Sequence, residues 1–328
     1  MLNCVYKVLL GVKMSIPSGV LQEVATIEQD RAQGAGELAR KAVGTLGLLA
    51  RQSMARDVRE FLEELDSLGS LLAGARPSMA PIQRAAASLI RSIHMRYAEE
   101  NDIGVLRDMT ARLAEEFQQR SRSASTEAAA VAAHALGGFG RILTHSRSRT
   151  VIDALIQWAS PDREVVITES RPLKEGIDTA GTLAAAHLSV TLITDAQVGL
   201  FVPRVEAVLI GADSVLRDGS VVNKAGTLLL ALAAHRFDVP VYVACETLKF
   251  HISPTKKEPV LEEKDPREIL TEEGAGFTVR NIYFDITPHD LLTGIATEVG
   301  LLTPKEAAQR IRQEENELIP WIERLVGV

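Results

Sequence analysis

Cysteine, aromatic side chains and long apolar runs are all scarce in this sequence of 328 residues. Its two cysteines, Cys4 and Cys245, lie far apart in the chain, so they form neither the spacing of a zinc site nor a disulfide framework. We therefore expect a cytoplasmic protein with no metal and no cofactor. No run approaches the length of about eighteen apolar residues that crosses a bilayer, so no membrane association is expected.

An excess of positive charge and several catalytic sequence patterns are also missing. The formal net charge is -7 and the pI is near 5.6, whereas a surface for nucleic acid usually needs clustered Lys and Arg. The seven histidines form no HxH or HExxH pattern, and the sequence contains neither GxSxG nor GxxxxGK followed by Ser or Thr. These absences disfavour direct nucleic-acid binding, zinc and serine hydrolases, and a Walker-type nucleotide site.

What the chain does contain is enough for two folded domains. Its length and its composition, 46% hydrophobic and 24% charged, are typical of a globular protein. We expect residues 1–14 to be a non-native or disordered extension, with Met14 as the alternative start. From residue 15 to 136, apolar residues recur every three or four positions, as at Leu62, Leu65 and Leu68, which predicts a helical N-terminal domain.

Two interruptions are predicted within this helical domain. The segment Arg76-Pro77-Ser78 ends one helix, because the residue before proline is pushed out of the helical region, and a new helix is expected at 80–97. The Ser-rich stretch at 121–125 is expected to separate a helix at 105–119 from one that continues through Ala135.

After Gly137 and Gly138, short apolar runs begin to alternate with helical patterns. This alternation predicts right-handed βαβ crossovers, and therefore an α/β fold in which residues 137–328 form a Rossmann-like parallel sheet with helices on both faces. The predicted strands are 141–144, 164–168, 189–193, 207–210 and 239–243, with a last strand at 282–284. The predicted helices are 150–158, 177–186, 196–202 and 226–236.

Three shorter patterns complete the prediction. Asp218-Gly219 predicts a turn, and residues 255–281 are polar and charged, which predicts a long surface excursion. Thr287 and Thr303 each stand before Pro and have an acid three residues later, so both predict helix starts.

Ligands of open parallel sheets bind beyond the carboxyl ends of the strands, so the residues that follow each predicted strand are the candidates for a site. After the first strand come Ser146, Arg147 and Ser148, whose hydroxyl and guanidinium groups could bind an anion near a helix start. The alternative is an exposed basic helix start that Ser146 or Ser148 caps. Arg171 follows the second strand at the same edge, although a lone loop Arg is usually a surface residue.

Three further segments supply candidates of a different kind. Asp213, after the strand at 207–210, either transfers protons or caps a turn. Asn223 and Lys224 are possible phosphate binders, because they precede a helix. The free backbone N–H groups of that helix are expected to face the same cleft. Gly34-Ala35-Gly36 lets the backbone approach a ligand closely at another helix start, but sequence spacing does not place it beside the sheet.

Several of these segments together resemble one protein family. They are ILTHSRSR, ITESRP, ITDA, LIGADSVLRDGSVVNKAGT, VYVACETLKF and FDITP, in this order. The sequence is similar, from Gln33 to Trp321, to the initiation factor 2B alpha/beta/delta family, which includes methylthioribose-1-phosphate isomerase and ribose-1,5-bisphosphate isomerase. The resemblance implies a helical N-terminal domain, a Rossmann-like C-terminal domain and dimers formed through the latter, hence a homodimer or a higher even oligomer.

The resemblance also implies roles for particular residues. In the isomerases, a Cys after the first strand and an Asp of the GAD block convert a phosphorylated aldose into a ketose. Asp213 matches that Asp, whereas Ser146 stands at the Cys position and Gln33 replaces an Arg. The phosphate-binding positions survive at Gly34, Gly36, Asn223 and Lys224, with Arg171 as an addition. A thiol titrates near neutrality and an unassisted Ser hydroxyl does not, so the standard acid/base chemistry is in doubt.

Three functions follow from this pattern. The first is a pocket that binds a phosphorylated sugar or a nucleoside monophosphate without turning it over. The second is an active isomerase of ribose 1,5-bisphosphate or methylthioribose 1-phosphate in which Asp213 works with His145 or a bound water. The third is an assembly subunit that binds other proteins and no small molecule.

Overall fold

The structure is a computed structural model that describes residues 16–30, 33–76, 79–97, 101–252, 261, 263–271 and 276–327. The expected extension at 1–14 and part of the expected excursion at 255–281 lie outside these residues. The chain forms two compact units. Unit 1 comprises residues 1–121, 252–256 and 315–328, and unit 2 comprises 122–251 and 257–314.

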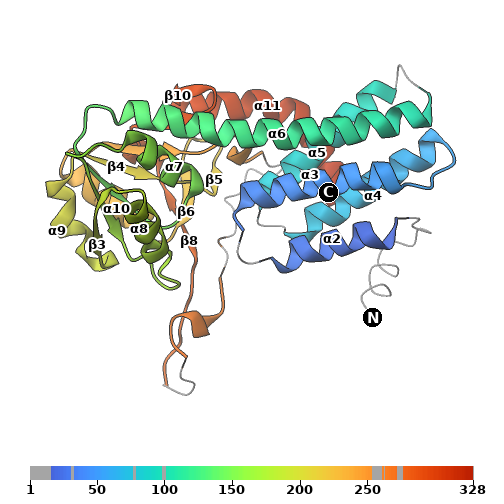
Figure 1. Ribbon diagram of the computed structural model, residues 1–328. Coiled ribbons are helices and arrows are strands. Elements are labelled where there is room, and N and C mark those ends of the chain that lie inside the picture. Colours follow the sequence, from blue (N-terminus) through green and yellow to red (C-terminus); the bar gives the residue numbers. More distant parts are fainter. Residues whose placement is uncertain are drawn as a thin grey trace. The chain divides into compact units, whose positions relative to one another are not determined.

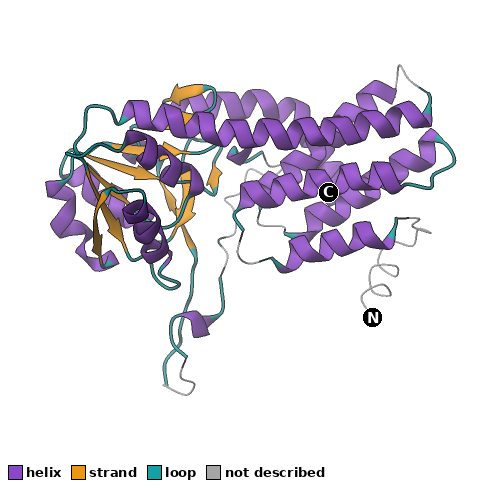
Figure 2. Ribbon diagram, viewed as in Figure 1, coloured by secondary structure: helices purple, strands orange, loops and turns teal. Residues whose placement is uncertain are grey.

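Unit 1 consists of helices (Figures 1 and 2). They are α2 (Ser18–Gln29), α3 (Ala35–Gln52), α4 (Val58–Ala75), α5 (Ala80–Tyr97), the first part of α6 (Ile103–Ala135) and the end of α11 (Pro304–Val326). Each buries an apolar stripe, and α3 and α4 both pack on α5. At Gly69 on α4 a side chain would collide with Ile90 and Leu325, so this glycine allows close helix packing.

The predicted interruption at 121–125 was wrong, because α6 runs through it without a break. The hydroxyl groups of two of its serines, Ser121 and Ser125, have distant partners instead of competing for the helix backbone. Ser121 accepts a hydrogen bond from Arg40 at 3.2 Å, and the hydroxyls of Ser125 and Thr150 lie 3.0 Å apart. The predicted helix at 80–97 agrees with α5.

Unit 2 is built on a seven-stranded sheet with the order β10-β9-β7-β4-β1-β2-β3, parallel except for β10. The strands are β1 (Arg141–Thr144), β2 (Glu164–Thr168), β3 (Ser189–Ile193), β4 (Ala207–Ile210), β7 (Val241–Ala244), β9 (Gly294–Thr297) and β10 (Gly300–Leu302). The strand order reverses between β1 and β4, which is the switch point where open α/β sheets bind ligands. β7 begins later than the predicted 239, since Pro240 has no N–H group for a strand ladder.

Helices cover both faces of this sheet, as Figure 2 shows. Successive residues of one strand enter opposite cores: Ile142 packs with α6, α7 and α8 residues, and Leu143 packs with α9, α10 and α11 residues. The helices are α7 (Arg149–Trp158), α8 (Glu175–Ala185), α9 (Val198–Phe201) and α10 (Thr227–Arg236). The predicted fold class, a helical N-terminal region and a mostly parallel sheet, is therefore confirmed.

A second, antiparallel sheet was missed in the sequence. It has the order β5-β6-β8, with β5 at Ser214–Val215, β6 at Val221–Lys224 and β8 at Phe284–Thr287. The predicted turn at Asp218-Gly219 does connect β5 to β6, and Gly219 has a φ of 91° there. β8 corrects the predicted last strand at 282–284, because it starts later and is followed by β9 and β10.

The two predicted helix starts had different outcomes. Thr303 begins α11 with reciprocal hydrogen bonds to Glu306, as a capping box requires. After Thr287 only the short 3-10 helix η5 (His289–Leu291) forms. The glycines and β-branched residues that follow favour the β9–β10 hairpin over a continued helix.

Candidate functional site

Two of the sequence-predicted residues follow the strands that flank the switch point. Ser146 comes after β1 and Asp213 after β4, and the two strands are parallel neighbours. The backbone at Ser146 is left-handed, with a φ of 68°. Its N–H donates to the Ser170 hydroxyl at 2.7 Å, and its carbonyl accepts from the Thr179 hydroxyl at 3.3 Å. The Ser146 backbone is therefore held firmly at the carboxyl edge of the sheet.

The side chains of Ser146, Arg147 and Ser148 have different surroundings. Among the described residues, the Ser146 hydroxyl makes no hydrogen bond, so no general base activates it. Ser148 caps α7 by accepting from the Val151 N–H at 3.4 Å, as one of the two sequence interpretations expected. Arg147 is exposed.

His145 is a buried structural residue of this edge. Its Nε2 lies 3.1 Å from the Ala225 carbonyl and its Nδ1 lies 2.6 Å from the Thr168 hydroxyl. A carbonyl only accepts, so Nε2 carries the hydrogen and Nδ1 accepts from Thr168. Burial lowers the pKa of His145 even though Asp195 is nearby, which favours this neutral form. With both ring nitrogens engaged, His145 is a poor partner for proton transfer at Asp213.

The loop after β2 is held by a carboxylate from the next strand end. Asp195 accepts from the backbone N–H groups of Ser170 at 2.8 Å and Arg171 at 2.7 Å. The peptide bond between Arg171 and Pro172 is cis. The Arg171 guanidinium is exposed and donates to the Ile269 carbonyl at 3.3 Å. Arg171 therefore lies at the predicted edge, but its guanidinium is already hydrogen-bonded to the backbone of another loop.

Lys224 is buried and already paired. Its Nζ lies 2.7 Å from Glu175 Oε1 and 3.2 Å from the centre of the Tyr283 ring. Burial lowers its pKa, and the carboxylates of Glu175, Asp213 and Glu268 act in the opposite direction. Because Asp213 acts electrostatically on Lys224, the structure brings these two predicted residues into one charged cluster.

The start of α10 is not open to a ligand in the way the sequence suggested. Asp285 on β8 accepts from the N–H groups of Gly226 at 2.7 Å and Leu228 at 3.1 Å. The predicted free helix N–H groups are therefore occupied at these two positions. Burial raises the pKa of Asp285 to about 6 despite these two bonds. The Asn223 amide is directed to the Thr227 hydroxyl at 3.0 Å.

Gly34, Ala35 and Gly36 form the start of α3 in unit 1, with Gly34 as the extended N-cap residue. A side chain at Gly34 would meet open space, so the backbone is accessible there. The neighbouring Gln33 keeps a buried Oε1 that has no hydrogen-bond partner among the described residues. Membership of this segment in the site of unit 2 remains a prediction.

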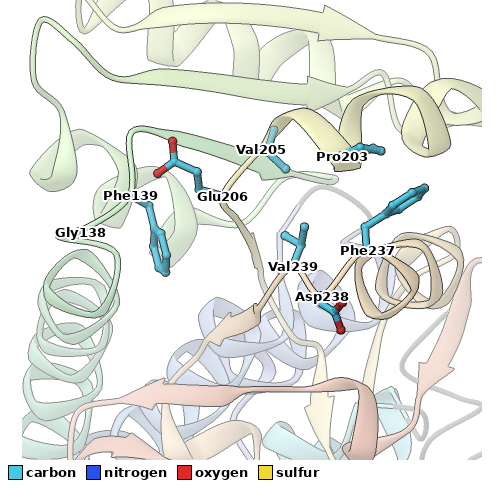
Figure 3. A pocket seen from close by; sticks show the side chains of 8 residues that line it. All are labelled: Gly138, Phe139, Pro203, Val205, Glu206, Phe237, Asp238 and Val239. Carbon is cyan, nitrogen blue, oxygen red and sulfur yellow. The ribbon is translucent and has the colours of Figure 1, made fainter.

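A pocket of about 600 Å³ lies at the opposite edge of the sheet (Figure 3). Its lining precedes β1, β4 and β7: Gly138, Phe139, Pro203, Val205, Glu206, Phe237, Asp238 and Val239. None of the predicted site residues lines it. Because ligands of open α/β sheets bind at the carboxyl ends of the strands, we place the site at the other edge.

Sequence reasoning missed Glu175, Asp195 and Asp285. Asp195 could have been predicted from the sequence, since it follows the strand at 189–193 in the same way that Asp213 follows β4. Glu175 could have been noticed as an acid in the first turn of a helix after β2. Asp285 had no such signal, because its role depends on the antiparallel pairing of β8 with β6.

The described residues contain neither a membrane-spanning helix nor a metal-binding cluster. No helix there is both long and apolar enough to cross a membrane. Within the same residues, no group of three or more His, Cys, Asp or Glu side chains is arranged to hold a metal ion.

Comparison with known proteins places this architecture in context. The model of the initiation factor 2 subunit family matches residues 31–304. An eIF-2B subunit 2-like protein of Pyrococcus abyssi is 37% identical over 300 residues, which cover 90% of this chain and 100% of that protein. The ribose 1,5-bisphosphate isomerase of Methanocaldococcus jannaschii is 32% identical, with 90% and 95% covered. The crystal structure of eIF-2B from Pyrococcus horikoshii superposes with a TM-score of 0.72 at 33% identity, covering 88% of this chain and 98% of that one.

Proposed function

This chain belongs to the initiation factor 2 subunit family, and from that premise we propose that it binds a phosphorylated sugar or a nucleoside monophosphate without isomerising it. The binding site is the carboxyl edge of β1 and β4. Ser146 and Asp213 follow these two strands, and Asn223 and Lys224 lie on β6 of the second sheet, where Asp213 acts electrostatically on Lys224. Arg147 and Arg171 are exposed cations of the loops after β1 and β2.

The observation that carries the proposal is the environment of Ser146. Where the family's isomerases use a thiol, this chain has a hydroxyl that no base contacts within the described residues. A Ser hydroxyl needs an adjacent base for acid/base or nucleophilic work, and the imidazole of the preceding residue, His145, has both nitrogens occupied. Binding needs no such group, and the firmly held backbone around Ser146 supports it.

The test is a titration of the purified protein with a panel of ribose 1,5-bisphosphate, methylthioribose 1-phosphate, ribose 5-phosphate and adenosine monophosphate. Calorimetry and thermal denaturation should show saturable binding and a raised midpoint for at least one of them. Stabilisation by none of them would contradict the proposal and would favour the role of an assembly subunit.

A second candidate is an active isomerase that uses Asp213. The relative from Methanocaldococcus jannaschii that is named as such an isomerase favours this candidate, as does the half-buried position of Asp213 beside the charge of Lys224. In this case the purified protein would produce a ketose, and Asp213→Asn would abolish production. Unchanged turnover in that variant would contradict this mechanism.

A further inference from the structure

The ammonium group of Lys224 is not an unpaired positive charge that could bind a phosphate by itself. Only 6% of its side chain is exposed, and Glu175 Oε1 lies 2.7 Å from Nζ. Tyr283 covers the group from another side, with the ring centre 3.2 Å away. Nζ makes no other polar contact with the described residues, so N–H capacity beyond the Glu175 pair is left for a ligand oxygen.

The backbone fixes Glu175 in this position. The next residue, Gly176, packs so closely against the end of β2 that a Cβ atom there would lie 1.8 Å from the Thr168 carbonyl oxygen. Its N–H donates to the Glu169 carbonyl at 3.2 Å, and the Glu175 carbonyl accepts from the Thr179 hydroxyl at 3.1 Å. The first turn of α8 therefore has little freedom to move Glu175 away from Lys224.

The second carboxylate oxygen of Glu175 has no partner. Oε2 is buried, and no described residue donates a hydrogen bond to it. An unsatisfied buried acceptor of this kind costs about 1–3 kcal/mol, more when it is charged. A ligand hydroxyl removes that cost, because it donates to Glu175 while it accepts from Lys224. An ionised phosphate only accepts, so it would leave Oε2 unsatisfied and add a like charge.

The surrounding charges also disfavour a phosphate next to the Glu175–Lys224 pair. Asp213 and Glu268 join Glu175 as carboxylates that act on Lys224, and the buried His145 is held neutral by its contacts. Arg147 is an exposed cation after β1 and is a candidate for the phosphate, whereas the Arg171 guanidinium already donates to the Ile269 carbonyl.

We propose that Glu175 is a specificity-determining residue, which neutralises Lys224 and selects ligands that place a hydroxyl group, rather than a second phosphate, against the Glu175–Lys224 pair. This inference rests on the proposed function, because it concerns the ligand of the same site. It implies that the wild-type protein prefers a monophosphorylated sugar to a bisphosphorylated one.

The test compares the affinities of ribose 5-phosphate and ribose 1,5-bisphosphate for the wild type and for Glu175→Gln by calorimetry. Removal of the carboxylate charge should shift the affinity ratio toward the bisphosphate by about tenfold, which is the effect of roughly one screened charge pair. Asp178→Asn is the matched control, because it removes an exposed carboxylate from the same turn of α8 and should leave the ratio unchanged.

Glu175→Met removes the charge with a similar side-chain length and replaces Glu175→Gln if that variant fails to fold. Glu175→Asp keeps the charge and should keep the wild-type ratio. An unchanged ratio, or a shift toward the monophosphate, in the charge-removing variants would overturn the role of Glu175 while wild-type binding still upheld the proposed function. No binding of either sugar phosphate by any variant would overturn the role of Glu175, and the proposed function would fall with it only if methylthioribose 1-phosphate and adenosine monophosphate also left the wild type unstabilised.

Discussion

Asp285 shows how one side chain of the second sheet organises the site. Its carboxylate bridges β8 to the start of α10 by accepting two backbone hydrogen bonds there, and Asp285 pairs with Asn223 on the neighbouring strand β6. A carboxylate at a helix N-terminus is favourable, but burial raises its pKa to about 6. The protonation state of Asp285 therefore makes the hydrogen bonds at the start of α10 sensitive to pH.

We expect the free energy of unfolding to fall as the pH rises from 4 to 6, because the folded state holds the Asp285 proton that the unfolded chain, with a pKa near 3.8, has lost. The fall due to this group should be about 1–3 kcal/mol. Asp285→Asn should flatten it. Urea denaturation at pH 4, 5, 6 and 7 measures the difference, and an identical slope in wild type and variant would contradict this assignment. Asp290→Asn, an exposed change on the following segment, is the control.

Individual site residues were predictable where they follow a parallel strand. Asp213 was found in this way, whereas Lys224 was found because it precedes a helix, and the two meet in one charged cluster. Partners were not predictable: Glu175 occupies the lysine, and Asp285 occupies the helix N–H groups that the sequence left free. Strand-end positions depend on local patterns, whereas these pairings depend on tertiary contacts.

At the scale of elements, the close contact of α8 with β2 is the most constrained feature of the site. Gly176→Ala places its methyl group against the Thr168 carbonyl, so we expect a loss of about 3 kcal/mol or more. Gly181→Ala in the same helix meets open space and should stabilise the protein by up to about 1 kcal/mol. Urea denaturation of both variants tests the contact, and equal stabilities would contradict it.

The elements themselves were largely predictable in the parallel sheet. The strands at 141–144, 164–168, 189–193 and 207–210 have the predicted bounds because their apolar runs are long and their turns are marked by polar residues. The small sheet was missed, since β5 is only two residues long and β8 pairs with a strand far away in sequence. The uninterrupted α6 was missed because the partners of its serines are distant.

For the whole molecule, α10 indicates a contact surface of unit 2. Its sequence TLLLALAAHR is apolar all round, yet Leu229 and Leu232 are 55% and 48% exposed, and Leu200 of the adjoining α9 is 62% exposed. A helix with this pattern is normally buried on all sides. The pattern supports the proposal that unit 2 forms a homodimer.

Light scattering should therefore give a mass of twice the 35.6 kDa of one chain, or a higher even multiple. Leu229→Glu should reduce the mass toward that of a monomer, because it buries a charge in the interface. Leu173→Glu changes a leucine of similar exposure that belongs to the loop after β2 and not to α10, and it should leave the mass unchanged. A wild-type monomer, or a dimer that Leu229→Glu leaves intact, would contradict this surface.

We infer that the whole molecule retains the ligand frame of its family without the acid/base group at position 146. The most direct measurement follows ribose 1,5-bisphosphate and methylthioribose 1-phosphate by NMR with catalytic amounts of wild type and of Ser146→Cys, after calorimetry has established binding. We expect binding without ketose formation by the wild type, and ketose formation by the variant, because its introduced thiol titrates near neutrality. Rapid formation of either ketose by the wild type would contradict this inference.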